Sequence, residues 1–438
     1  MFKGIGKLNL KAKEKQTFKI HIAYSAIEGI IFGVLALNEF VFIKSLNGSN
    51  YQLGVLFQFS MLVFVFLVFF NEFLKRYKNK RKLLRFVAIY TRLPLISLAF
   101  FPNNAEAVSG NSIYHYIFLL IFLIYYFGNP IIYPTINLFL RNKYENKNFG
   151  KLFGYATSLN KIITLIATLI YGILLDANHF AFTYVFPIVA ILGILSLFLL
   201  SKIDCVINTT ETIKQKFWTS VKNSVLEMLR ILKNNRPYRD FEIGFMFYGF
   251  SFMITTAVIT IFFEKTLNLN YSSFAFYKNA YNIIAIILLP ISGKILGKID
   301  PRKYAAITFA SLLLYLLFLS LTEYYPLHFD VLGIKIYFLL IPAYVFYGIF
   351  AATMSLLWFI GSAYFCKNED AGTYQSVHLS LTSVRAMFAP LLGVFFYELI
   401  GFTGTFAIAI ISLAIAIAVM YYSFYVDKKS TTSKTSST

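Results

Sequence analysis

The sequence has few charged side chains, and acidic ones are the scarcer kind. Charged residues make up 14% of its 438 residues, with 20 Asp and Glu against 40 Lys and Arg. Soluble domains carry about 25% charged residues, so the composition excludes an ordinary water-soluble protein. Cysteine is also rare, since Cys205 and Cys366 are the two in the chain. Both fall on segments that we expect in the cytoplasm, where disulfides are rare, so we predict neither a disulfide nor a Cys/His metal site.

Several motifs of enzymes are absent as well. The sequence has no Gly-x-x-x-x-Gly-Lys-Ser/Thr loop for nucleotides, no His-Glu-x-x-His motif and no Gly-x-Ser-x-Gly elbow. We therefore predict no catalytic site and no cofactor. The formal net charge of +20 could indicate nucleic-acid binding. The basic residues lie in short loops between apolar runs, however, which favours a lipid bilayer as the partner and not a nucleic acid.

Apolar residues are abundant, at 58% of the chain. They fall in windows of about 20 residues, the length at which a helix spans a hydrocarbon layer of about 30 Å. Every backbone group in that layer must be paired internally, so these windows are expected to be helices. We predict an all-α membrane protein with about twelve transmembrane helices, near residues 20–43, 52–74, 84–101, 112–140, 152–175, 182–201, 241–264, 272–293, 304–322, 335–363, 373–397 and 402–426.

The basic residues set the predicted orientation. Of the 40 Lys and Arg, 32 lie in the tails and loops of one side, 3 lie in loops of the other side and 5 lie within the spans. Cytoplasmic loops carry an excess of Lys and Arg, so we assign the basic side to the cytoplasm. An even number of helices then places both termini there, and we expect a multi-pass protein of the plasma (inner) membrane.

The two halves of the chain resemble each other at an offset of 221–222 residues. Residues 79–82 and 300–303 both form a basic loop, Gly150 lies opposite Gly372, and Asp176 lies opposite Glu398. Six predicted helices separate the copies, so both halves should have the same orientation. Transporters built from such parallel repeats hold their substrate between the halves, near the middle of the membrane.

This repeat divides the chain into five parts. We expect a cytoplasmic tail at 1–19, a six-helix bundle at 20–201, a cytoplasmic linker at 202–240, a second six-helix bundle at 241–426 and a disordered cytoplasmic tail at 427–438. In the linker, Trp218, Val225, Leu229 and other apolar residues recur at helical spacing. This pattern predicts an amphipathic helix along the inner membrane surface, with a plain linker as the alternative.

Two loops carry a motif of a known family. Residues 293–303 read Gly-Lys-Ile-Leu-Gly-Lys-Ile-Asp-Pro-Arg-Lys, and residues 71–82 hold a similar basic cluster without the glycines and the Asp. With the two six-helix halves, this loop resembles the major facilitator superfamily, whose motif is Gly-x-x-x-Asp-Arg-x-Gly-Arg-Arg. The resemblance implies two bundles around a central cavity, lined in part by the first, fifth and eleventh helices. It also implies a gating role for Gly293, Asp300 and Arg302, while anchoring of the loop by its positive charge is the alternative.

Charged residues inside the spans are the main site candidates, because a charge at the middle of the membrane costs at least about 2.5–3.5 kcal/mol. Glu28 lies on the first span, Lys161 on the fifth and Arg385 on the eleventh. In the repeat overlay Lys161 falls within two positions of Arg385. We predict an anionic substrate between these two cations, with Glu28 as counter-ion or proton carrier. A structural pair between Glu28 and one cation is the alternative.

Other polar residues share the faces of these charges or lie beside helix breakers. Asn160 accompanies Lys161, and His378 and Thr382 precede Arg385 at helical spacing. Asn129, Tyr248 and Tyr344 are candidate cavity-lining groups, with interhelical hydrogen bonding as the alternative. For Arg92 a structural pair is favoured over ligand contact, and for Lys278 an outward orientation toward the membrane surface is favoured over a cavity.

We predict a secondary active transporter that works by alternating access on a small-molecule substrate, a small organic anion being favoured. Export of amphipathic or hydrophobic compounds is the alternative cargo. A non-transporting receptor or scaffold, or a membrane enzyme, would be another class of protein. Without a nucleotide loop, the energy would come from a gradient, with proton or sodium coupling as candidates, and we expect a monomer.

Overall fold

The computed structural model describes residues 10–66, 77, 79–104, 106–108, 110, 112–203, 217–296, 298–367 and 370–435. Within these residues nine helices are long and apolar enough to cross a membrane. The last of them, Thr373–Lys429, holds two of the expected helices. The helices α3 (Asn50–Leu62) and α12 (Tyr271–Leu296) correspond to the expected spans near 52–74 and 272–293. The predicted all-α membrane fold of about twelve transmembrane helices is therefore confirmed.

The chain forms two compact units, which we describe separately. The first contains Met1–Gln52 with Phe66–Phe217, and the second contains Leu53–Val65 with Trp218–Thr438. We expected residues 53–65 in the first bundle. They group with the second unit because α3 packs on its late helices: Nε2 of Gln58 donates to the carbonyl of Met387 at 2.6 Å. Gly54 lies against Leu391, where a β-carbon would come within 3.1 Å.

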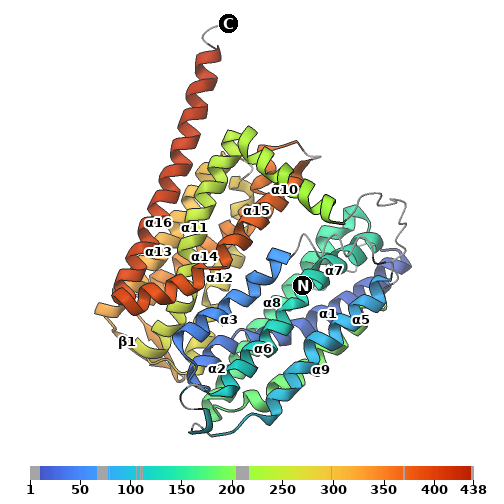
Figure 1. Ribbon diagram of the computed structural model, residues 1–438, viewed down its shortest axis with the longest axis vertical. Helices are drawn as coiled ribbons and strands as arrows, with labels where there is room; N and C mark the ends of the chain where they lie inside the picture. Colours follow the sequence, from blue (N-terminus) through green and yellow to red (C-terminus); the bar gives the residue numbers. More distant parts are fainter. Residues whose placement is uncertain are drawn as a thin grey trace. The chain divides into compact units, whose positions relative to one another are not determined.

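The first unit is built from helices that pack side by side in Figure 1. They are α1 (Ala12–Leu35), α2 (Asn38–Lys44), α5 (Lys80–Arg92), the 3-10 helix η3 (Leu93–Phe100), α6 (Ile113–Phe127), α7 (Asn129–Lys143), α8 (Asn146–Ala177) and α9 (Phe182–Leu200). α1 packs against both α8 and α9. The approach to α8 requires glycine, since a β-carbon at Gly33 would lie 2.6 Å from that of Ala167.

Prolines break two of the expected helices. The span predicted at 112–140 consists of α6 and α7, which meet at Gly128 and Asn129, just before Pro130. The span predicted at 84–101 begins as α5 and continues as η3 from Leu93, with Pro94 at the junction. Proline lacks the amide hydrogen that continues an α-helix, which explains both interruptions.

The second unit contains α10 (Phe217–Asn234), α11 (Arg236–Ile261) with the short π-helical turn η5 (Phe262–Thr266), α12, α13 (Pro301–Tyr324), α14 (Leu340–Ile360), the 3-10 turn η6 (Ser362–Phe365), α15 (Ala371–Ala386) and α16 (Ala389–Thr435). α16 packs along α11 and α13, and α14 packs against α12 and α13 (Figure 1). Gly401, with φ of 71°, interrupts α16 and separates the eleventh expected helix from the twelfth.

A β-hairpin connects α13 to α14 at the end of the second unit away from α10 (Figure 1). Strands β1 (His328–Val331) and β2 (Ile334–Tyr337) pair antiparallel through a turn at Leu332 and Gly333, whose φ values are 51° and 77°. Positive φ at both turn residues matches the hairpin turn that suits strand twist. The prediction of a helix from residue 335 was wrong, because residues 335–337 belong to β2.

The predicted linker and the predicted C-terminal tail both contain helix. The amphipathic helix is present as α10, and Trp218 and Leu229 on it are 71% and 59% exposed. Residues 427–435 continue α16 as helix, where we predicted disorder; extending an existing helix costs little. Residues 1–9, most of the motif at 71–78, Cys205 within 204–216, and residues 436–438 lie outside the described part.

Candidate functional site

The first unit contains a cavity of about 210 Å³ at the break between α6 and α7, lined by residues of both helices. Glu28 of α1, Arg92 of α5 and Asn129 of α7 line it together. Glu28 is 5% exposed, and its Oε1 accepts a hydrogen bond from Oγ of Ser196 at 2.6 Å. The tyrosines around this acid–base site are Tyr24, Tyr125, Tyr126 and Tyr133. A buried carboxyl and a buried guanidinium thus share one small cavity.

Arg92 is held firmly on the wall of this cavity. Its Nη1 donates to the carbonyl of Tyr125 at 3.0 Å, and its Cζ lies 3.8 Å from the centre of the Tyr125 ring. Gly193 of α9 makes room for it, since a β-carbon there would lie 3.1 Å from Cδ of Arg92. Nε of Arg92 has no hydrogen-bond partner among the described residues. The guanidinium therefore has a structural anchor and also faces the cavity.

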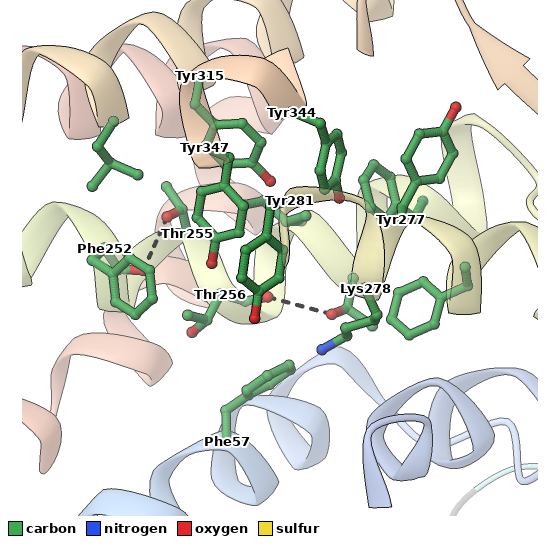
Figure 2. Close-up of a pocket in the computed structure, with 15 residues that line it drawn as sticks. Phe57, Phe252, Thr255, Thr256, Tyr277, Lys278, Tyr281, Tyr315, Tyr344 and Tyr347 are labelled. Carbon is green, nitrogen blue, oxygen red and sulfur yellow. Dashed lines mark hydrogen bonds between the residues drawn. The ribbon is translucent and has the colours of Figure 1, made fainter. Parts of the chain in front are cut away.

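The second unit contains a larger aromatic cavity of about 230 Å³ between α11, α12, α13 and α14 (Figure 2). Most of the residues that line it have aromatic rings or hydroxyl groups, and the full set is Phe57, Phe252, Thr255, Thr256, Ile259, Thr260, Phe263, Phe274, Tyr277, Lys278, Tyr281, Leu312, Tyr315, Tyr344 and Tyr347. The rings of Tyr315 and Tyr347 stack at 4.5 Å between centroids. Tyr344, predicted as a cavity-lining group, is among these residues.

Lys278 contributes the charge of this aromatic cavity. Figure 2 shows its ammonium group between the side chains of Phe57 and Tyr281, and Nζ lies 5.9 Å from the centre of the Phe57 ring. Among the described residues that line the cavity, none is acidic. We favoured an orientation toward the membrane surface for Lys278; the structure places it on the cavity wall instead, because α12 turns this face toward α11 and α14.

Two helices of the second unit meet through a buried acid–base pair. Nδ1 of His378 on α15 lies 3.0 Å from Oε2 of Glu242 on α11. The side chains of His378 and Glu242 are 2% and 3% exposed. Glu242 was not among the predicted site residues, because it is the second residue of the predicted span 241–264. An offset of 221 residues aligns Glu242 with His21 of α1, which is buried as well.

Arg385 lies two turns beyond His378 on α15 and is 2% exposed. Its Nη1 donates to the carbonyl of Phe245 at 2.6 Å, and its Cζ lies 6.0 Å from the centre of the Tyr248 ring. Tyr248 in turn stacks on Phe309 at 4.8 Å. Tyr248 and Arg385 are therefore together, as interhelical partners, and neither lines the aromatic cavity.

The remaining predicted residues have varied surroundings. Nδ2 of Asn160 donates to the carbonyl of Ser25 at 2.9 Å, so Asn160 joins α8 to α1. Lys161 beside it is exposed, and Thr382 is buried on α15. Lys161 and Arg385 belong to different units, so the predicted anion site between them stays a prediction.

The predicted gating loop forms an ionic cluster at the start of α13. Asp300 caps the helix by accepting from the amide of Arg302 at 2.8 Å, and its carboxylate also accepts from the Arg302 side chain at 3.0 Å. Nη1 of Arg302 donates to Asp427 at 2.5 Å and to the carbonyl of Ser423 at 3.0 Å. Arg302 therefore ties the start of α13 to the late turns of α16. Gly293 lies in α12, near its end at Leu296.

The chain is similar in fold to several solved transporters. Over 95% of its length it matches the nucleoside transporter NupG, with 13% identity, a TM-score of 0.67 and the whole of that chain covered. It matches a bacterial homologue of the human lysosomal transporter Spinster in an inward-facing conformation, with 14% identity, a TM-score of 0.61 and 95% and 98% of the two chains covered. A POT family transporter in complex with 5-aminolevulinic acid matches with 14% identity, a TM-score of 0.67 and 94% and 96% coverage.

The comparison with families gives a more specific result. No curated protein matches the chain. A family model described as Major Facilitator Superfamily matches residues 20–373, which is most of the sequence. That match agrees with the repeated loop motif and the paired helical halves. The chain therefore belongs to the major facilitator superfamily of membrane transporters.

Proposed function

We propose that the protein is a secondary active transporter that moves small organic anions across the membrane by alternating access. The observation that carries this proposal is Lys278, a cation on the wall of a cavity whose described lining residues include no acid. An ammonium group in surroundings less polar than water attracts an anion more strongly than it would in water. Lys278 is therefore the group that would select a negatively charged solute.

The rest of the cavity wall fits a flat solute with a ring. Tyr281, Tyr315 and Tyr347 present ring faces, and Thr255 and Thr256 add hydroxyl groups (Figure 2). Ring pairs gain about 0.5–1.5 kcal/mol beyond their burial, and hydroxyls orient polar substituents. The volume of about 230 Å³ suits one ring with a small acidic group. The same fold holds a small organic acid in the POT family transporter that is in complex with 5-aminolevulinic acid.

Arg92 and Glu28 form a second functional candidate in the first unit. Their cavity is lined by opposite charges, so it is suited to a proton or to a polar end of a solute more than to a second organic anion. We propose that both termini lie in the cytoplasm of a plasma (inner) membrane protein, as the positive loops indicate. The expected monomer remains part of this proposal.

Exchange across vesicles tests the cargo. Purified protein would be placed in vesicles of phosphatidylethanolamine and phosphatidylglycerol, loaded with unlabelled 4-hydroxybenzoate or benzenesulfonate. The labelled form of the same anion would be added outside, and its uptake in exchange for the unlabelled anion inside would be measured. Uptake by protein-free vesicles would be the baseline. We expect protein-dependent exchange of both anions and none of benzyl alcohol or benzylamine. Exchange confined to the neutral or cationic compound would instead support export of amphipathic compounds and would refute an anion carrier.

A further inference from the structure

The buried pair of Glu242 and His378 has no role in the anion cavity. Nδ1 of His378 lies 3.0 and 3.1 Å from the two carboxylate oxygens of Glu242, so in this arrangement its N–H donates to the carboxylate. Both side chains are almost completely buried. Ionisable groups are costly to bury in a membrane protein, and they are functional candidates for that reason. This pair therefore calls for an explanation other than helix packing.

His378 has a second ring nitrogen that can accept a proton. Nε2 is buried and has no hydrogen-bond partner among the described residues. The imidazole packs edge-on against the rings of Phe245 at 4.9 Å and Trp358 at 4.8 Å between centroids. Nε2 is therefore the ring nitrogen of His378 that Glu242 leaves available for a proton.

Few other charged or titratable groups face the pair. Arg385 of α15 and Tyr238 of α11 both interact electrostatically with Glu242. The hydroxyl of Tyr238 donates to the carbonyl of Tyr374 at 2.7 Å and also has a hydrogen-bond interaction with Glu242. The groups that face this region from η6, α13, α14 and α16 are Cys366, which interacts with Tyr238, and the uncharged Phe309, Trp358 and Met420.

The charge of this cluster depends on one proton. With a neutral imidazole, the negative charge of Glu242 and the positive charge of Arg385 cancel. A proton added to Nε2 of His378 makes the Glu242–His378 pair neutral and leaves the cluster with one net positive charge. An anion bound in the same unit would balance that charge. The attraction between the two charges is stronger in the low-polarity interior than it would be in water.

We propose that the Glu242–His378 pair is the proton-binding site that couples anion transport to a proton gradient. The proton comes from the aqueous phase, binds Nε2 of His378 and is released to the other side, while Nδ1–H stays bonded to Glu242. This proposal rests on the proposed anion transport, because the anion supplies the balancing charge. By linkage, a proton that strengthens anion binding by some factor must itself be bound more tightly by the same factor when the anion is present.

A continuous row of aromatic rings joins the pair to the anion cavity. Phe245, which contacts His378, lies 5.5 Å from Tyr248 between centroids, and Tyr248 lies 6.2 Å from Phe252 on the cavity wall. The guanidinium group of Arg385 lies beside this row, with its Cζ 6.0 Å from the centre of the Tyr248 ring. The two sites can therefore influence each other electrostatically without direct contact.

The two tryptophans of the chain allow a test without any substrate. Trp358 touches His378, whereas Trp218 is 71% exposed on α10. A Trp218→Phe variant of the full chain in lipid nanodiscs would report on Trp358 alone. A protonated imidazole quenches an adjacent indole, so we expect fluorescence to fall as the pH is lowered from 8.5 to 5. His378→Gln should abolish this change, because it removes the group that the proton binds.

His115→Gln is the matched control, because His115 is a buried histidine of the first unit whose Nε2 lies 2.6 Å from the carbonyl of Leu46. It should leave the curve unchanged. Fluorescence that does not vary with pH, or that varies equally in His378→Gln, would overturn the proton site even if anion exchange is intact. Absence of exchange with a normal fluorescence curve would instead reject the proposed anion transport.

Coupling itself is measured in vesicles. An inward proton gradient should raise accumulation of labelled benzenesulfonate by the Trp218→Phe protein above that seen without a gradient. In the Glu242→Gln and His378→Gln variants we expect the gradient to lose this effect. If the proton gradient raises anion accumulation in either variant as much as in the parent protein, the proposal is contradicted.

Discussion

Gly249 on α11 leaves the space that the guanidinium group of Arg385 on α15 occupies. A β-carbon at Gly249 would lie 1.7 Å from Cζ of Arg385. The guanidinium cannot withdraw without cost, because it is 2% exposed and its Nη1 holds the carbonyl of Phe245 at 2.6 Å. Arg385 can therefore pack against α11 because residue 249 has no side chain.

Replacing Gly249 by alanine should destabilise the second unit. The new methyl group would displace Arg385 and break its bond to Phe245, an overpacking cost of about 1–3 kcal/mol. Thermal unfolding of the detergent-solubilised protein should therefore begin at a lower temperature. Gly154→Ala is the control, because a β-carbon at this helical glycine would meet nothing within 4 Å. Equal melting temperatures for the two variants would show that Arg385 has room to move.

The carboxylate of Glu14 should stabilise the start of α8. Its Oε1 accepts from the amide of Glu145 at 2.9 Å and from Nδ2 of Asn148 at 3.3 Å. A negative charge at a helix N-terminus is favourable, and loss of a cap costs about 0.5–2 kcal/mol. Glu14→Gln should lower the melting temperature. The glutamine side chain has no negative charge, and its NH2 group would point at the N–H donors of Glu145 or Asn148. Glu227→Gln, on the exposed face of α10, should not; a similar loss in both would remove the capping explanation.

Arg302 should hold the late turns of α16 against α13. It bonds to Asp300, Ser423 and Asp427 at once, which a lysine cannot reproduce with one ammonium group. Arg302→Lys should therefore increase amide hydrogen exchange in residues 423–435. Lys298→Arg, in the exposed part of the same loop, serves as the control. Unchanged exchange in Arg302→Lys would mean that α16 is held by its apolar contacts alone.

The proposed orientation can be measured by labelling intact cells. In a Cys205→Ser, Cys366→Ser background, Leu332→Cys would place a thiol on the hairpin turn, where Leu332 is 98% exposed. A membrane-impermeant maleimide should label it from outside. Lys429→Cys, near the end of α16, should be labelled after the cells are opened. The reverse pattern would contradict the assignment of the basic loops to the cytoplasm.

The sequence was sufficient for the fold, because helix length, charge asymmetry and the internal repeat are properties of the chain alone. It also singled out Glu28, Tyr248, His378 and Arg385 as polar residues in apolar spans, and all four are buried in the structure. It could not decide their partners. Whether Lys278 faces a cavity or the membrane surface depends on how α12 is rotated against α11 and α14, and the hydrophobicity of the α12 sequence does not reveal that rotation.

Two features escaped the sequence analysis for different reasons. Glu242 lies at the predicted end of a span, where an acidic residue is common. It became a candidate because Nδ1 of His378 lies 3.0 Å from its carboxylate in the structure. The β-hairpin was missed because Ile334 and Ile336 read as the start of an apolar helix. Short apolar runs do not distinguish a strand from a helix, and the Leu332-Gly333 turn was the available signal.

Substitution of Lys278 tests the central claim most directly. In the vesicle exchange assay with benzenesulfonate, Lys278→Met should abolish exchange, since it removes the positive charge of the aromatic cavity. Lys278→Arg should retain part of it, because it keeps that charge. Lys298→Met, which removes an exposed lysine outside the cavity, should exchange as the parent protein does. If Lys278→Met exchanges benzenesulfonate at the parent rate, the aromatic cavity of the second unit is not the anion site.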